Sequence, residues 1–307
     1  MSTPDTNLLA SAFASGVTLP SQLDTNFEEA LRHVLDHPGS LIRPKMIYQI
    51  GEAYGLTKSA SIDLAIALEY FHTASLLFDD LPCMDNARER RGVPCVHIVY
   101  GESGAILTAL ALINQAYALL WRSVRSVPFA LQADALTYIE QRLGVGGLLN
   151  GQSLDLHYAT LPHDRATTEA IARGKTVSLI RLTLVLPAML GGASVRELRW
   201  LERISLFWGL SYQMVDDLKD VLASADEAGK TVARDLFLDR PNAAAVLGVD
   251  GAVKRLMRYM SLGDRTLQRL LQSRPALAFL ATLRKSLEAE LALVAGHASL
   301  STSGVRS

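Results

Sequence analysis

Hydrophobic residues recur every three to four positions along most of this chain, which is the spacing typical of α-helices. Runs with the two-residue alternation of β-strands are scarce. Glycine and proline mark the joints between the helical stretches, as at His37-Pro38-Gly39 and Gly191-Gly192. The pattern therefore predicts an all-α protein. The predicted helices cover residues 26–35, 44–54, 59–78, 104–124, 131–149, 167–190, 194–223, 242–262 and 276–293.

No long Ser/Pro/Gly linker divides the chain, so we predict one helical domain over residues 25–298. We expect residues 1–24 to be only partly ordered and residues 299–307 to form a flexible tail. The segment Gly104–Trp121 carries no charge over a membrane-spanning length. Polar residues interrupt it, and a core helix of a large all-α protein reads the same way. We therefore expect a buried helix and no integral membrane span.

Charge and cysteine content exclude several classes of function. The 307 residues carry a formal net charge of −1, which gives no reason to expect nucleic acid as a partner. Cys83 and Cys95 form no CxxC pair, so we predict neither a disulfide framework nor a zinc site. The N-terminal segment lacks a basic region followed by an apolar stretch, so we expect the protein in the cytoplasm.

Two aspartate motifs stand within apolar helical sequence. In the first, Asp79 and Asp80 end a long apolar run, and Pro82 lets the chain turn so that Asp85 returns beside them. In the second, Asp216-Asp217-Leu-Lys-Asp220, the first and last carboxylates lie one helical turn apart on the same face.

Adjacent carboxylates next to apolar sequence are costly unless a positive charge compensates them. Magnesium suits this role, because it takes oxygen ligands and bridges a few carboxylates to the phosphates of a substrate. Two solvated acidic helix ends are the alternative, and the presence of two motifs disfavours it. Basic residues near both motifs would supply the remaining charge that a diphosphate needs. These residues are Arg43, Lys45, Arg90, Arg91, Lys175, Lys230 and Arg234.

The stretch HTASLLFDDLPCMDNARERRGVPCVH, followed by YGESGAIL and later by QMVDDLKD, resembles trans-isoprenyl diphosphate synthases. The chain is especially similar to geranylgeranyl and farnesyl diphosphate synthases, from about Leu35 to Gly248. The segments GQSLDL and GKT also look like motifs of this family. The resemblance implies an isoprenoid synthase helical bundle around a central cavity, usually in a homodimer.

The resemblance also implies a role for each motif residue. The aspartates would bind magnesium, with three ions per site: Asp79, Asp80, Asp85, Asp216, Asp217 and Asp220. The allylic diphosphate would be held by Arg90, Lys175 and Lys230, and the isopentenyl diphosphate by Arg43, Arg91 and His97. Thr176 and Gln213 would lie near the carbocation and the departing proton. The predicted reaction joins an allylic diphosphate to isopentenyl diphosphate after ionisation.

The chain departs from the family most clearly where members read GGKRxRP. The residues here are Pro38-Gly39-Ser40-Leu41-Ile42-Arg43-Pro44, so Ser40 replaces the lysine expected to bind isopentenyl diphosphate. Loss of one charged hydrogen bond costs about 1.5–3 kcal/mol. Two other functions therefore stay open: an enzyme such as a terpene synthase that ionises a prenyl diphosphate without isopentenyl diphosphate, and a non-catalytic partner subunit. Intact metal motifs argue against the partner subunit.

Product length should depend on residues before Asp79, because a growing prenyl tail would run down that helix. A helix rises about 1.5 Å per residue, so Ala74 would lie roughly 7–8 Å below the metals. Ala74 and Ser75 are small, which favours a C20 product over C15. Phe71 lies further down, either as the floor of the channel or as a core residue.

Overall fold

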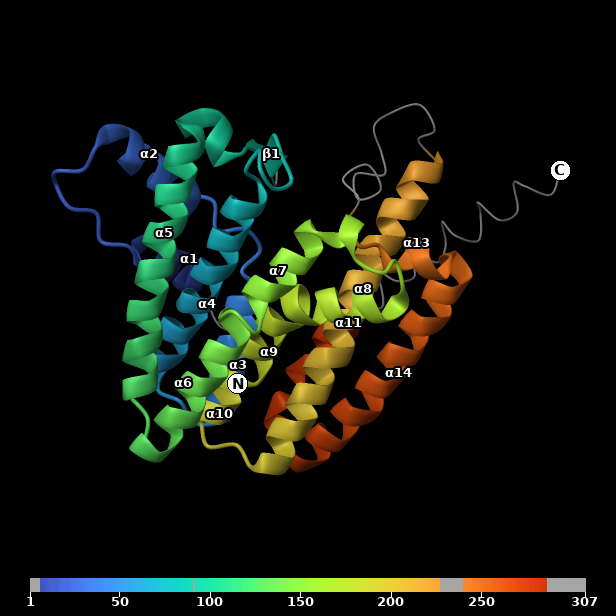
Figure 1. The fold of residues 1–307 in the computed structure, drawn as a ribbon. Coiled ribbons are helices and arrows are strands. Elements are labelled where there is room, and N and C mark those ends of the chain that lie inside the picture. Colours follow the sequence, from blue (N-terminus) through green and yellow to red (C-terminus); the bar gives the residue numbers. More distant parts are fainter. Residues whose placement is uncertain (1–5, 91, 227–239, 286–307) are drawn as a thin grey trace. The chain divides into compact units, whose positions relative to one another are not determined.

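The computed structural model describes residues 6–90, 92–226 and 240–285. These residues are almost entirely helical, which confirms the predicted fold class (Figure 1). The exception is a short antiparallel hairpin of β1 (Glu89–Arg90) and β2 (Val93–Pro94). The chain forms two compact units, the first from Met1–Thr137 and Leu186–Ala193, and the second from Tyr138–Val185 and Ser194–Ser307.

The first unit is built around helix α4 (Lys58–Asp79), which contacts three other helices. Its residues are buried on several faces, from Leu64 to Leu77, and a helix that is apolar all round belongs in a core. The other helices of this unit are α1 (Thr6–Ser15), α2 (Thr25–Leu35), α3 (Ile42–Ala53), α5 (Val96–Arg125), α10 (Leu186–Leu190) and the start of α6 (Phe129–Leu143).

Helix α1 lies in the segment that was expected to be only partly ordered. Leu9 and Phe13 are fully buried, and the Phe13 ring packs against Tyr70 of α4 with ring centroids 5.0 Å apart. The Tyr70 hydroxyl donates a 2.5 Å hydrogen bond to the Phe13 carbonyl oxygen. Two buried apolar side chains in a short stretch are too few for a sequence pattern to stand out, but they are enough to dock a helix.

Helix α5 begins earlier than predicted, because a bend at Gly101 (φ 77°, ψ 163°) joins an extra turn to it. Helix α5 is long and apolar enough to cross a membrane. Core helices of soluble proteins also meet this criterion. It is not a fully buried helix, however. One face exposes large apolar side chains, each 38–53% exposed: Ile98, Val99, Ile106, Leu107, Leu110, Tyr117 and Trp121.

The second unit contains the remaining long helices and several short ones. The long helices are α11 (Val195–Asp226) and α14 (Val249–Ser273), which pack against each other. The short elements are α7 (Leu148–Leu156), η1 (Tyr158–Thr160), α8 (Arg165–Ala172), η2 (Arg173–Val177), α9 (Ser178–Leu184), α13 (Ala243–Leu247) and η3 (Pro275–Leu277).

Two predicted helices are divided in the structure. The predicted helix over residues 131–149 splits into α6 and α7 at Gly144–Gly147, since clustered glycines weaken a helix. The predicted helix over residues 167–190 is broken by η2, a π-helical turn at Arg173–Val177. Such turns are rare and occur frequently at functional sites. The periodicity of a single π-helical turn differs too little from that of an α-helix for η2 to be recognised in the sequence.

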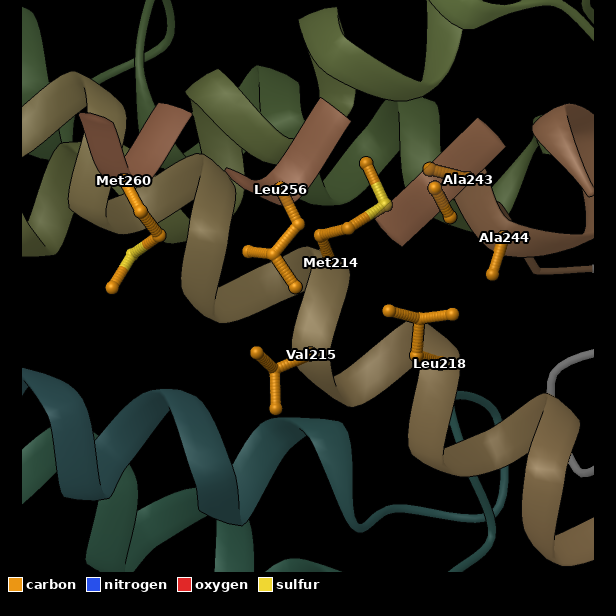
Figure 2. Close-up of a cluster of buried hydrophobic side chains, with 8 residues drawn as sticks. Met214, Val215, Leu218, Ala243, Ala244, Leu256 and Met260 are labelled. Atoms are coloured by element: carbon orange, nitrogen blue, oxygen red, sulfur yellow. The ribbon is translucent and has the colours of Figure 1, made fainter. Parts of the chain in front are cut away.

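A hydrophobic cluster holds α11, α13 and α14 together (Figure 2). Met214 and Leu218 extend from α11 toward Ala243, Ala244 and Leu256, and Val215 and Met260 belong to the same cluster of buried side chains. The cluster fixes the stretch of α11 that carries the second aspartate motif.

Candidate functional site

A hydrogen-bonded turn holds the first aspartate motif at the end of α4. Asp79 is the last residue of the helix, and its carbonyl oxygen accepts a 2.9 Å hydrogen bond from the backbone N–H of Asp85. Asn86 completes the turn in the left-handed conformation (φ 48°), which Asn tolerates better than most residues. The return of Asp85 predicted from the sequence therefore occurs, and the turn also needs Asn86.

Asp80 has a different environment from its two neighbours in the motif. The residue is 3% exposed, and both carboxylate oxygens accept hydrogen bonds from Nε of Arg90, at 2.8 and 2.9 Å. Nη2 of Arg90 donates a further bond of 2.5 Å. The hydrogen bond to Asp80 raises the pKa of the Arg90 guanidinium. A predicted metal ligand and a predicted diphosphate cation thus bind each other in the structure.

The second motif lies in the middle of α11, where Asp216 and Asp220 are partly exposed. Burial raises the pKa of the Asp220 carboxyl, and its Oδ2 has no hydrogen-bond partner among the described residues. Asp217 is buried instead. Its Oδ1 accepts a 2.9 Å bond from Nε2 of Gln213, and its Oδ2 accepts a 2.8 Å bond from the Ala243 N–H at the start of α13.

Thr176 and Gln213, predicted to lie near the reacting carbon, are directly bonded. The Thr176 hydroxyl donates a 2.8 Å hydrogen bond to Oε1 of Gln213. Because the amide of Gln213 then donates to Asp217, one chain of hydrogen bonds links η2, α11 and α13. Asp217, a predicted magnesium ligand, therefore connects α11 to α13 through its own hydrogen bonds.

Lys175, on the π-helical turn η2, forms an ion pair with Asp155 of α7 at 2.9 Å. Asp155 also lies 4.0 Å from the Arg240 guanidinium, and its carbonyl oxygen accepts a 3.3 Å hydrogen bond from the same side chain. Sequence reasoning gave neither Asp155 nor Arg240 a role, although GQSLDL, which contains Asp155, looked like a family motif. Lys175 thus resembles Arg90: both are predicted to bind the diphosphate, and both are paired with a carboxylate in the structure.

The residues expected to bind isopentenyl diphosphate occupy different elements of the first unit. Arg43 lies in the first turn of α3, and His97 lies in the first turn of α5. His97 is 7% exposed, and neither ring nitrogen has a hydrogen-bond partner among the described residues. A buried imidazole without partners is costly, so His97 is suited to receive a polar ligand.

The altered GGKRxRP segment, residues 38–44, runs into the first turn of α3. Ser40 is exposed, while Leu41 is buried and adopts a left-handed conformation (φ 52°) that is uncommon for leucine. Leu41 has therefore become a core residue at a position where the family has an arginine.

The residues expected to control product length differ in accessibility. Ala74 is fully buried, so it does not line an open channel as the sequence-based interpretation assumed. Ser75 is partly exposed and lies four residues, about one helical turn, before Asp79. Phe71 is 7% exposed and packs edge-on against Tyr117 of α5, with ring centroids 5.0 Å apart. This contact is that of a core residue.

The fit to magnesium follows from the chemistry of the side chains. Among residues 6–90, 92–226 and 240–285, no group of three His, Cys, Asp or Glu side chains lies close enough to hold a metal ion by itself. Magnesium does not require such a cage, because it binds through one or two carboxylates together with waters and substrate phosphates. Asp79, Asp85, Asp216 and Asp220, whose buried Oδ2 has no hydrogen-bond partner in the part of the chain that the structure describes, supply such ligands. Arg91 and Lys230 lie outside the described residues.

Comparison with known proteins agrees with these observations. The model of the polyprenyl synthetase family matches residues 24–266. Geranylgeranyl pyrophosphate synthase 9, chloroplastic, of Arabidopsis thaliana is 34% identical over 247 residues, covering 78% of this chain and 68% of the relative. Geranylgeranyl pyrophosphate synthase 10, mitochondrial, of the same plant is 36% identical over 234 residues, covering 74% of this chain and 67% of the relative.

Among solved structures, a geranyltransferase from Helicobacter pylori complexed with magnesium and isoprenyl diphosphate has a TM-score of 0.74 at 25% sequence identity. The match covers 96% of this chain and 98% of that protein. The fold and the motifs define a prenyltransferase of the isoprenoid synthase type, as the sequence predicted. The chain belongs to the polyprenyl synthetase family.

The predicted cytoplasmic location is wrong. The similar plant proteins are named chloroplastic and mitochondrial. The prediction looked for the basic region and apolar stretch of a secretory signal, whereas organelle transit peptides are amphipathic, rich in Arg and Ser, and poor in acidic residues. The absence of a secretory signal therefore says nothing about targeting to chloroplasts or mitochondria.

Proposed function

We propose that this protein condenses an allylic prenyl diphosphate with isopentenyl diphosphate and releases a C20 diphosphate. The observation that carries the proposal is the turn that returns Asp85 to Asp79, beside the Arg90–Asp80 pair. The names of the plant relatives support the product, and the ligands of the bacterial neighbour support magnesium and a prenyl diphosphate.

Asp79 and Asp85 in the first unit, and Asp216 and Asp220 in the second, are the proposed magnesium ligands, for three ions per site. Magnesium, when bound, neutralises negative charge on the diphosphate leaving group. Arg90 and Lys175 donate hydrogen bonds to the same group, where negative charge develops as the bond to carbon breaks. Lys230 is proposed to assist them.

The Asp80–Arg90 and Lys175–Asp155 pairs suggest how these cations are kept in position. In each pair a carboxylate accepts a hydrogen bond from the cation. This bond restricts the long side chain of the arginine or lysine, which would otherwise move freely. A diphosphate presents more oxygens and more charge than one carboxylate, so it competes for the same donors. We propose that Asp80 and Asp155 orient the cations and so reduce the entropy lost when the substrate binds.

For isopentenyl diphosphate, the proposed binding residues are Arg43, Arg91 and His97. The ring nitrogens of the buried His97, which have no hydrogen-bond partner among the described residues, support this assignment. After condensation, the Thr176–Gln213 pair is proposed to stabilise the cation, and a proton passes to the released diphosphate.

The burial of Leu41 favours one alternative, an enzyme that ionises a prenyl diphosphate without using isopentenyl diphosphate. Incubation with isopentenyl diphosphate and a labelled allylic diphosphate, with and without magnesium, distinguishes the two. Longer diphosphates formed only with magnesium would support elongation. A hydrocarbon or alcohol of unchanged carbon number would favour the alternative, and no turnover would favour a non-catalytic partner subunit.

We also propose a homodimer in which a second copy covers the exposed apolar face of α5. Leu107 and Leu110 are each about half exposed there, together with Tyr117 and Trp121. A patch of this size on one helix is unusual for a monomer. Leu110→Asp should convert a dimer into a monomer in light scattering, whereas Glu102→Asp, on the same helix, should not. A wild-type monomer would refute this part of the proposal.

A further inference from the structure

A cavity of about 410 Å³ lies within the second unit, lined by residues of α6, α7, α8, η2 and α9. None of the proposed catalytic residues that the structure describes lines it. Its walls are mainly polar and include four arginines: Arg142, Arg165, Arg173 and Arg181. The residues at the start of α7, among them Gly147 and Asn150, form another part of the wall. Such a concentration of guanidinium groups needs a counter-charge.

Carboxylates near the cavity supply only part of that charge. Glu202 lies 2.8 Å from Nε of Arg181 and 3.8 Å from Nη2 of Arg142. It also accepts a 2.5 Å hydrogen bond from the Tyr138 hydroxyl. A single carboxylate thus serves two arginines and a tyrosine.

Glu169 serves three further arginines. It accepts a 2.7 Å hydrogen bond from Arg255 and lies 3.5 Å from Arg173 and 3.8 Å from Arg165. The four arginines of the cavity wall therefore share two glutamates, and Glu169 also pairs with Arg255 outside the wall, so at least two positive charges of the wall are left uncompensated by the ion pairs of the described residues. Guanidinium groups remain charged at any pH at which the protein is folded.

Two buried donor atoms behind the cavity wall also lack a well-formed hydrogen bond among the described residues. Nε of Arg142 and Nε of Arg181 are buried and make no hydrogen bond of acceptable geometry, although Arg181 lies close to Glu202. Helix α7 has no side-chain cap at Gly147, so its first backbone N–H groups depend on other acceptors. Helix N-termini and arginines both favour phosphate groups as ligands.

We propose that this cavity binds a small polyanion through a diphosphate group, separately from the substrates. The apolar side chains of the lining are few and mostly small, such as Leu154, Ala166 and Ala170. The ligand therefore has no long prenyl tail. Arg142 and Arg181, which are 24% and 21% exposed, form the inner part of the site. Arg165 and Arg173, each 52% exposed, stand at its rim.

Calorimetric titration of the full chain with inorganic diphosphate tests the proposal. The titration is done in EDTA, because without a divalent cation the aspartate motifs repel diphosphate. We expect one diphosphate bound per chain in the wild type. Arg142→Gln combined with Arg181→Gln should weaken the Kd at least tenfold, and Arg122→Gln, which breaks an ion pair with Asp63 in the first unit, should leave it unchanged. Equal binding by the double variant, or equal weakening by Arg122→Gln, would overturn the proposal.

Arg173→Gln provides a second test, since its half-exposed side chain can be replaced without disturbing the core. It should weaken diphosphate binding at least threefold, even if the double variant fails to fold, and an unchanged Kd for a folded Arg173→Gln would count against the site.

Geranyl diphosphate should bind no tighter than inorganic diphosphate, and a tenfold preference for it would refute a tail-free ligand. Asp216→Ala should retain this binding, so the result is independent of the proposed catalysis.

Discussion

The backbone of Gly151 in α7 lies directly against that of Gly174 in η2. A methyl group added to Gly174 would lie 2.7 Å from Cα of Gly151, and one added to Gly151 would clash with the Gly174 backbone and the Lys175 nitrogen. This contact brings Asp155 within ion-pair distance of Lys175. The two glycines are therefore required because two backbones meet, and neither has a positive φ.

Gly151→Ala should consequently separate α7 from η2. We expect overpacking to cost about 1–3 kcal/mol of unfolding free energy and turnover to fall, because the Lys175–Asp155 pair is disturbed. Thermal melting and steady-state kinetics measure these effects. Gly146→Ala is the matched control, since no atom lies within 4 Å of the added methyl group. A Gly151→Ala protein with wild-type stability would show that the two backbones can move apart freely.

Removal of a proposed magnesium ligand should abolish turnover while the fold is kept. Asp79→Ala and Asp216→Ala should each lower kcat by several orders of magnitude, because the ligand acts where charge develops on the leaving group. Assays at saturating magnesium, with circular dichroism of each variant, measure this. Asp63→Ala, which removes the partner of the exposed Arg122 far from the motif in the chain, is the control. Near-normal activity of either motif variant would disprove the metal assignment.

Arg90→Gln should leave the buried Asp80 carboxylate without its cation. Because Arg90 is about one-third exposed, we expect a loss of about 1–3 kcal/mol in unfolding free energy, less than for a fully buried pair. The KM for the allylic diphosphate should also rise. Arg32→Gln breaks the exposed pair with Glu28 and should cost about 0.5 kcal/mol or less. Equal losses from the two variants would mean that the Arg90 pair has no special role.

Ser40→Lys should restore a charge for isopentenyl diphosphate at an exposed position. We expect the KM for isopentenyl diphosphate to fall about tenfold or more, the effect of one charged hydrogen bond, with little change for the allylic substrate. Initial rates with each substrate varied in turn measure both constants. A higher KM for isopentenyl diphosphate would show that another group already occupies this position.

Ser75→Phe should shorten the product from C20 toward C15, because Ser75 is partly exposed about one turn before Asp79. Ala74→Phe is the matched comparison. Since Ala74 is fully buried, a phenylalanine there should mainly destabilise the fold. Chromatography of the dephosphorylated products gives the chain length. A shift caused by Ala74→Phe in a stable protein, with none for Ser75→Phe, would reverse the assignment.

The sequence by itself determined the helical class, the family and most of the helices. These properties depend on local spacing: a period of three to four residues predicts helices, and Asp79 and Asp80 followed by Asp85 form a motif within seven residues. Even the return of Asp85 follows from local turn chemistry. Thr176 and Gln213 were assigned together through the resemblance, and the structure joins them by a hydrogen bond.

The tertiary structure alone decided which partner each functional side chain has. Asp155 meets Lys175 because α7 and η2 touch at two glycines, and Ala74 is inaccessible because α4 is covered by neighbouring helices. The cavity formed around Arg142 and Arg181 was likewise invisible, since its residues are scattered from α6 to α9. Local patterns fix the backbone of a helix, but burial and charge pairing depend on residues far apart in the chain, which only packing brings together.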